Sequence, residues 1–248
     1  MQKAVMNWSG GKDSALCLHR VLQGGEREVT HLLTSVNEHY GRIAMHGVRV
    51  ELLRRQAESI GIELVQLLMP EMPSMEVYER LMFETMERLR AGEVTHAVFG
   101  DIFLEDLREY RERQLQKIGM RGVFPLWQIP TRRLMEEFIE EGFKAVIVCV
   151  DERHLDKSFC GRLIDQSFLD DLPEKVDPCG ENGEYHSFVF DAPYFKRPVS
   201  FTVGEIVYRR YQPARSENQS DCYDHDRAAQ NFETGFYYCD LVPVESNE

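Results

Sequence analysis

The segment Ser9-Gly10-Gly11-Lys12-Asp13-Ser14 decides the fold, because it joins an apolar run to an amphipathic one. The preceding run, residues 3–8, predicts a strand, and the following run, residues 14–23, predicts a helix. Glycines in this setting let backbone N–H groups approach an anion closely, and the helix N-terminus adds a favourable dipole. The lysine adds a positive charge and the two serines add hydroxyl donors. The segment therefore predicts a cradle for pyrophosphate or for the β- and γ-phosphates of a nucleotide.

The spacing within this segment excludes a Walker A loop, in which four residues separate the first glycine from Gly-Lys-[Ser/Thr]. Here Asp13 follows the lysine. A carboxylate beside a phosphate cradle is costly unless a cation accompanies it, so Asp13 predicts a Mg²⁺ ion bridging to phosphate. The alternative is an ordinary glycine-rich helix start with a serine or aspartate N-cap. That alternative requires the six residues and their strand–loop–helix setting to coincide by chance.

Outward from this loop, short apolar runs alternate with longer amphipathic ones, which is the pattern of a parallel sheet wrapped by helices. Each predicted strand of the first third but the last is followed by a helix, so right-handed crossovers predict a doubly wound α/β sheet. The further strands are predicted at 29–36, 63–68 and 95–100, and the helices at 47–60 and 75–91.

The regular alternation of strands and helices stops near residue 128, and we expect two domains, a nucleotide-binding domain at 1–128 and a smaller substrate-side domain of mixed α+β type at 129–248. Thr131 is the predicted N-cap of a helix that runs to residue 141. The polar stretch 212–230 predicts a mobile loop between two strands that pair across it. The other elements are predicted as helices at 105–118 and 161–169, a last strand of the first sheet at 122–127, and strands at 143–150, 184–190, 201–211 and 235–242.

Residues 9–14 resemble the PP-loop of the N-type ATP pyrophosphatases, which split ATP into AMP and pyrophosphate to activate a carboxylate or carbonyl oxygen. Over roughly residues 1–195 the chain is further similar to the diphthine–ammonia ligase family, also called diphthamide synthetases. The resemblance implies a HUP-like (adenine nucleotide alpha hydrolase-like) PP-loop fold, ATP and Mg²⁺ as cofactors, and an amide-forming, AMP-forming ligase of diphthamide biosynthesis. The matching segments are Gly100-Asp101-Ile102, Pro125-Leu126-Trp127, Gly142-Phe143-Lys144-Ala145, Gly161-Arg162 with Asp165, and, most specific, Asp177-Pro178-Cys179-Gly180-Glu181-Asn182-Gly183-Glu184-Tyr185-His186.

Polar residues at the ends of the predicted strands complete an expected nucleotide site, because open α/β sheets place ligands at the carboxyl ends of strands. Asp101 is predicted to face the nucleotide or its metal, and the alternative is an N-cap of the following helix. Ser35 is predicted to meet adenine through its backbone, and His46 lies near the same edge but is equally well explained as surface. The predicted ATP site comprises Ser9, Gly10, Gly11, Lys12, Asp13, Ser14, Ser35, His46 and Gly100, with Asp13 as metal ligand and Lys12, Asp13 and Asp101 as catalytic residues.

The stretch 181–186 predicts a substrate site beside a tight turn, which Asn182-Gly183 signals strongly. Alternation in the strand after the turn puts Glu184 and His186 on one face and Tyr185 on the other. A glutamate and a histidine beside apolar residues are expensive to bury without a partner, so we predict that Glu184 is catalytic. The glutamate and the histidine would hold ammonia, orient the acceptor or move a proton, and the alternative is a hairpin tip with its charges in water. The predicted substrate-binding residues are Glu181, Asn182, Gly183, Glu184, Tyr185 and His186.

The composition limits the partners of this 248-residue chain, which carries 29 Lys+Arg against 42 Asp+Glu for a net charge of −13. Such a charge disfavours extended nucleic-acid binding. The six cysteines include no CxxC pair, so neither zinc nor an iron–sulfur cluster is expected, and Cys179 is disfavoured as a nucleophile because no basic residue or second thiol is near it in sequence. No apolar run approaches the roughly 20 residues of a membrane span and no export signal is visible, so we expect a cytoplasmic protein without membrane partners.

Together these features predict an ATP-dependent amide-forming ligase. The acceptor carboxylate would attack the α-phosphorus of ATP, and ammonia would then displace AMP from the acyl-adenylate. No glutaminase domain is visible, so free ammonium is the expected nitrogen source. The resemblance implies the diphthine of elongation factor two as acceptor if the chain is archaeal or eukaryotic, and another carboxylate if it is bacterial. Modification of a tRNA base by the same activation, and a nucleotide-binding sensor without turnover, stay open as alternatives, as does a homodimer.

Overall fold

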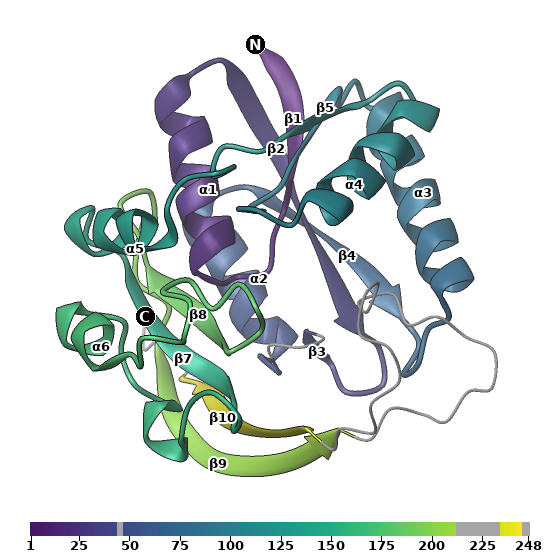
Figure 1. Ribbon diagram of the computed structural model, residues 1–248. Coiled ribbons are helices and arrows are strands. Elements are labelled where there is room, and N and C mark those ends of the chain that lie inside the picture. The colour runs from purple at the N-terminus through teal and green to yellow at the C-terminus, as the bar shows by residue number, and fades with distance from the viewer. Residues whose placement is uncertain (44–46, 212–233, 245–248) are drawn as a thin grey trace.

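A computed structural model describes residues 1–43, 47–211 and 234–244 of the chain (Figure 1). Its first sheet, sheet A, contains β1 (Gln2–Asn7), β2 (Arg27–Asn37), β4 (Glu63–Met69), β5 (His96–Val98) and β6 (Arg121–Val123). These strands pair in parallel in the order β4-β2-β1-β5-β6, and the short β3 (Arg42–Ile43) pairs antiparallel with the end of β2. The predicted doubly wound α/β sheet is confirmed.

Helices cover both faces of sheet A, as Figure 1 shows. On one face α1 (Lys12–Gly24) and α2 (Val50–Ile60) contribute to the larger apolar core. On the other face α3 (Met75–Ala91) and α4 (Glu105–Lys117) enclose a smaller core with side chains of β1, β2, β4 and β5. Strand order reverses between β1 and β5, so the loops after these two strands lie at the switch point of the sheet, where such folds bind ligands.

The second sheet, sheet B, is antiparallel in the order β8-β7-β10-β9. Its strands are β7 (Lys144–Asp151), β8 (Tyr185–Asp191), β9 (Phe201–Tyr211) and β10 (Thr234–Pro243), accompanied by α5 (Thr131–Glu140), the 3₁₀ turn η1 (Lys157–Phe159) and α6 (Gln166–Asp171). The predicted pairing of the last two strands is confirmed, and β10 ends at Pro243.

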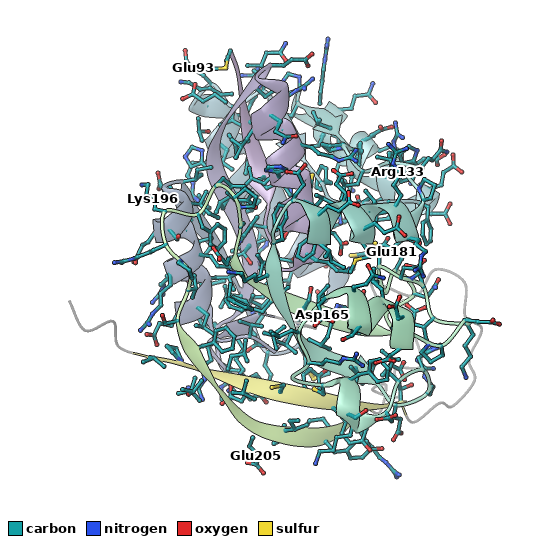
Figure 2. All side chains as sticks on the ribbon, turned by 90° about the vertical axis from the view of Figure 1, so that its left-hand side faces the viewer. Glu93, Arg133, Asp165, Glu181, Lys196 and Glu205 are labelled. Carbon is teal, nitrogen blue, oxygen red and sulfur yellow. The ribbon has the colours of Figure 1, made fainter. Side chains whose placement is uncertain are left out.

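The two sheets share one core. The larger apolar cluster runs without a break from α1 and α2 to β7, β8 and β10, and β8 contacts α1 directly. In the view of Figure 2, Glu93 near the start of β5 and Glu205 on β9 lie at opposite ends of the molecule, and Glu181 lies between them. The residues before β8 are therefore placed beside α1. The domain boundary at residue 128 stays a prediction.

Several predicted elements are wrong in detail, each for a local reason. The helix predicted at 161–169 begins only at Gln166, because the Asp165 side chain caps it by accepting from the Phe168 N–H at 2.9 Å. The residues before it instead bond to β7, with Ile164 N donating to Ala145 O at 2.9 Å. Thr131 is not an N-cap: the cap residue is Pro130, which has no side-chain cap bond.

Two other boundaries shift. The strand predicted at 122–127 is only β6, which ends before Pro125, where the backbone loses a donor. The helix predicted at 47–60 begins at Val50, because Gly47 has a φ of +66° that is incompatible with the helix. The predicted mobile loop at 212–230 lies outside the described residues.

Candidate active site

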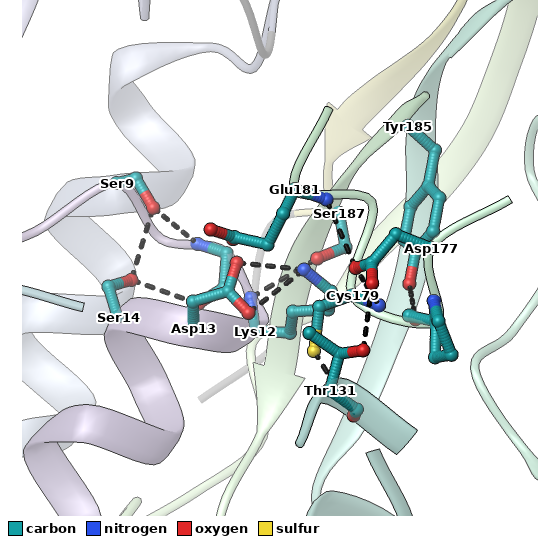
Figure 3. Close-up of polar contacts among 12 residues, drawn as sticks. Ser9, Lys12, Asp13, Ser14, Thr131, Asp177, Cys179, Glu181, Tyr185 and Ser187 are labelled. Carbon is teal, nitrogen blue, oxygen red and sulfur yellow. Dashed lines mark hydrogen bonds and ion pairs between the residues drawn. The ribbon is translucent and has the colours of Figure 1, made fainter. Parts of the chain in front are cut away.

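Residues 9–14, named the PP-loop for their resemblance to that motif, leave β1 and end at the N-terminus of α1 (Figure 3). Gly10 has a φ of +75°, and a Cβ there would lie 2.7 Å from the Gln56 Oε1 atom, so only glycine fits. Gly11 is the N-cap residue of α1 and has no side-chain cap. Its N–H donates to Ser9 Oγ at 3.2 Å, and the Ser9 and Ser14 hydroxyl oxygens are 3.1 Å apart. The loop thus lies at a helix N-terminus, the setting that favours anions, and its role as a phosphate cradle stays a prediction.

Lys12 is the cation of this loop and is 4% exposed. Its Nζ atom donates to both carboxylate oxygens of Asp13, at 2.9 and 2.7 Å, and lies 5.2 Å from the ring centroid of Tyr185. Burial alone would lower the pKa of Lys12, but the negative charge of Asp13 beside it holds the pKa above its ordinary value. Lys12 is therefore a fixed positive charge at the start of α1.

Gly100 and Asp101 bring the end of β5 to the same place. A Cβ on Gly100 would lie 3.1 Å from the carbonyl carbon of Asp13, so the missing side chain permits the close approach of β5 to α1. Burial raises the pKa of Asp101; the nearby Arg111 opposes this rise and the charge of Asp13 adds to it. Asp101 therefore senses the charge of Asp13, and its predicted role toward the nucleotide or its metal stays a prediction.

The contacts of Asp101 also test the alternative that it is the N-cap of the following helix. Arg111 Nε lies 3.2 Å from Asp101 Oδ2 as an ion pair, yet this buried oxygen has no partner of hydrogen-bond geometry within the described ranges. The cap residue of α4 is Leu104, without a side-chain cap bond. The N-cap alternative for Asp101 is therefore wrong.

Glu184 is enclosed by its own loop. It is 1% exposed, and its carboxylate accepts from the backbone N–H of Asp177 at 3.1 Å and from both the backbone N–H and the side-chain Nδ2 of Asn182, each at 2.9 Å. Burial would raise the pKa of Glu184, but these hydrogen bonds hold it below its ordinary value. The carboxylate therefore stabilises the loop of residues 177–184, and its catalytic role stays a prediction.

Glu181 is the member of this loop that faces the PP-loop. Figure 3 shows its side chain directed toward Asp13, and its backbone N–H donates to Asp177 Oδ1 at 3.3 Å. Burial together with the charge of Asp13 raises the pKa of Glu181 to about 8, although Lys12 opposes the rise. A glutamate with this pKa exchanges its proton near neutral pH, which suits acid–base chemistry.

The strand that follows the loop presents alternate residues to the PP-loop. Ser187 Oγ accepts from the Lys12 N–H at 3.1 Å, and the Val189 N–H donates to Gly10 O at 2.9 Å. Tyr185 is buried on the same face, and its hydroxyl donates to the Pro178 carbonyl oxygen. His186 is half-buried and lies in register with Cys149 of β7, so it points away from this face.

Three further residues were considered in the sequence, namely Ser35, His46 and Cys179. Ser35 is half-buried near the carboxyl end of β2, in register with Leu67, at the same edge of sheet A as the PP-loop. His46 lies outside the described residues. Cys179 is buried, burial raises its thiol pKa, and the thiol donates to Thr131 O at 3.4 Å, which agrees with an inert side chain.

Sequence reasoning missed two residues of this region, Gln56 and Ser187. Each is a buried polar residue bonded to the PP-loop backbone. A polar residue in an amphipathic helix is usually on the solvated face, so nothing in the sequence marks Gln56.

Within the described ranges no group of three or more His, Cys, Asp or Glu side chains is arranged to hold a metal ion. Nor does that part of the chain contain a helix with the length and apolarity to cross a membrane.

Comparison with known proteins identifies the family. The N-terminal domain model of diphthamide synthase matches residues 1–122, and the C-terminal domain model matches residues 130–213. The two models cover most of the chain, and the chain belongs to the diphthamide synthase family, with a PP-loop-type fold. The family resemblance is confirmed.

The curated relatives carry one name, diphthine–ammonia ligase. The human protein is 24% identical over 223 residues, which is 80% of this chain and 82% of the human one. The Rattus norvegicus protein is 24% identical over 233 residues, with the same two shares. The Schizosaccharomyces pombe protein is 30% identical over 100 residues, which is 39% of this chain and 16% of that protein.

Proposed function

We propose that this chain is a diphthine–ammonia ligase that uses ATP to adenylate an acceptor carboxylate, releases pyrophosphate, and then transfers ammonia to form an amide. The ligase class follows from the names of the relatives in the same family. One observation carries the mechanism: the PP-loop and the 177–184 loop, far apart in the chain, meet around the buried Lys12. A phosphate cradle on one side and a titratable carboxylate on the other are the two parts that such a reaction requires.

The PP-loop is the proposed binding element for the departing pyrophosphate. The positive end of the α1 dipole and the Lys12 ammonium would offset the charge that develops on the phosphate oxygens. In the structure Lys12 Nζ forms an ion pair with the Asp13 carboxylate, so phosphate would compete with that carboxylate for the same donors. Ser35, at the same sheet edge, is the proposed contact for adenine.

Asp13 and Asp101 are the residues we propose to hold Mg²⁺. Mg²⁺ is commonly bound by one or two carboxylates together with substrate phosphates, and the orphaned, buried Oδ2 atom of Asp101 fits such a donor. When bound, the ion would neutralise phosphate charge and activate the α-phosphorus toward attack.

Glu181 is the proposed base for the second half-reaction. Its carboxylate would take one proton from ammonium, and the lone pair of the resulting ammonia would attack the acyl carbon to form the C–N bond of a tetrahedral intermediate. This intermediate would lose its second proton from nitrogen to solvent water and collapse, which breaks the bond between the acyl carbon and the AMP oxygen and releases AMP. A pKa of about 8 is close to what a base for ammonium requires near neutral pH.

Product analysis tests the proposal. The chain is incubated with labelled ATP, Mg²⁺ and ammonium, with and without elongation factor two that carries diphthine. We expect AMP and pyrophosphate to appear in step with the amidated acceptor, and only when it is present. ADP and phosphate, or bound ATP without turnover, would overturn the activation chemistry. AMP formation with a different carboxylate or a tRNA, but none with elongation factor two, would overturn the acceptor.

A further inference from the structure

Gln56 of α2 is a fully buried side chain, 0% exposed, that the proposed reaction does not use. All of its polar atoms are engaged. Its Oε1 accepts from Trp8 Nε1 at 3.0 Å, and its Nε2 donates to Gly10 O at 3.0 Å and to Val189 O at 2.5 Å. One amide therefore joins the end of β1, the PP-loop and β8 of the second sheet.

The Gly10 carbonyl is the centre of this arrangement. It accepts from Gln56 and also from the Val189 N–H, at 2.9 Å. The same peptide unit carries the Gly11 N–H, which points opposite to the carbonyl because a trans peptide is planar. Two donors on the carbonyl thus fix the direction of the Gly11 N–H, which in this structure meets Ser9 Oγ on the cradle side.

We infer that Gln56 is a positioning residue that aims the Gly11 N–H into the phosphate cradle and holds β8 against the PP-loop in one register. This inference rests on the proposed function, because it assigns Gln56 to the pyrophosphate site of that reaction. Since β8 begins directly after the 177–184 loop, the same amide also sets the distance between Glu181 and the cradle. Without the amide, the peptide after Gly10 would keep one donor and could rotate, since glycine permits both conformations.

The test compares Gln56→Met with Trp8→Phe. Gln56→Met has similar volume and removes all three hydrogen bonds, whereas Trp8→Phe removes only the bond to Oε1 and leaves both carbonyl bonds intact. Thermal unfolding measures the stability of each variant. Titration with inorganic pyrophosphate and with ATP, without acceptor, measures binding independently of turnover.

We expect Gln56→Met to weaken pyrophosphate and ATP binding about tenfold, the loss of one hydrogen bond to a charged group. Trp8→Phe should change binding less than about twofold even where its melting temperature falls as far, because its stability loss comes from packing and not from the cradle. Equal weakening in both variants, or none in Gln56→Met, would overturn the inference. If Gln56→Met does not fold, Gln56→Asn, which keeps the amide but is too short to reach both carbonyls, gives the same comparison. A wild-type chain that binds neither ligand would instead overturn the proposed function.

Discussion

Replacing Glu181 by glutamine should stabilise the protein at alkaline pH and leave its stability unchanged in acid. Burial and the charge of Asp13 raise the pKa of Glu181 from 4.5 to about 8, so the folded state holds a proton over a range in which the unfolded state has lost it. The wild-type free energy of unfolding therefore falls as the pH rises from about 4.5 to 8. Below that range the Glu181 carboxyl is neutral in both states. Above it, the folded state carries the full free-energy cost of the buried, ionised carboxylate.

The size of the effect follows from the same values. A tenfold change in a proton equilibrium corresponds to about 1.4 kcal/mol, so a pKa raised from 4.5 to about 8 sets an upper bound of roughly 5 kcal/mol. Solvent reaches part of this side chain and screens its charge, so we expect Glu181→Gln to gain about 1–3 kcal/mol at pH 9 relative to pH 5. Glutamine is nearly isosteric, so packing should contribute little.

Denaturant unfolding of both proteins between pH 4.5 and 9 measures this difference. Glu205→Gln, a change at an exposed glutamate on β9, is the matched control and should alter stability by less than about 0.5 kcal/mol at each pH. Parallel curves for the wild type and Glu181→Gln would show that this carboxyl does not face the negative charge of the PP-loop, and the proposed base would lose its support.

Glu184→Gln should act with the opposite sign, because hydrogen bonds hold the pKa of Glu184 below its ordinary value, so its stabilisation is present at neutral pH and is lost as the pH falls through the folded pKa. Chemical unfolding at pH 7 should show a loss of about 1.5–3 kcal/mol in the free energy of unfolding, and no loss would refute the role of this carboxylate in the loop. Asp13→Asn should abolish pyrophosphate release from a folded protein, measured by product analysis with circular dichroism as the check on folding, and near-normal release would refute the metal assignment. Gly10→Ala should destabilise by about 1–3 kcal/mol in thermal unfolding, because φ is +75° and the new Cβ meets Gln56 Oε1 at 2.7 Å; an unchanged melting temperature would show that the loop adapts. Glu181→Gln should lower the ammonium-dependent rate by about 10²–10⁴ with ATP binding retained, and rate assays across pH that still show the wild-type profile would refute its role as base.

Most of sheet A could be predicted from the sequence, because its information is local. Apolar runs followed by amphipathic ones specify strands and helices, and the glycine-rich segment after β1 marks the turn into α1. The prediction was wrong where a single side chain overrides the pattern. Asp165 caps α6 and delays its start, and Thr131 uses its hydroxyl to donate to Asp177 at 2.7 Å instead of capping α5.

The site was predicted only in part, because its two halves come from different sheets. Residues 9–14 and Asp101 could be placed by the rule that ligands lie at the carboxyl ends of parallel strands. No such rule says which face of β8 meets the PP-loop, and a shift of one residue exchanges the faces of a strand. The prediction favoured the face of Glu184 and His186, whereas Ser187, on the other face, bonds to the Lys12 N–H.

The contacts at the PP-loop explain why the two sheets share one core. If the second sheet only carried the acceptor site, a polar and separable interface would be sufficient. Instead β8 supplies a backbone donor to Gly10 and a hydroxyl acceptor to Lys12. The buried Gln56 amide of α2 also donates to the carbonyl oxygens of Gly10 and Val189. Each of these bonds fixes part of the proposed phosphate cradle, so the proposed cradle is not complete in the first sheet alone. A break in the contact between β8 and the PP-loop would therefore disturb both the PP-loop and the placement of Glu181, which in the proposed reaction would link activation of the acceptor to delivery of ammonia.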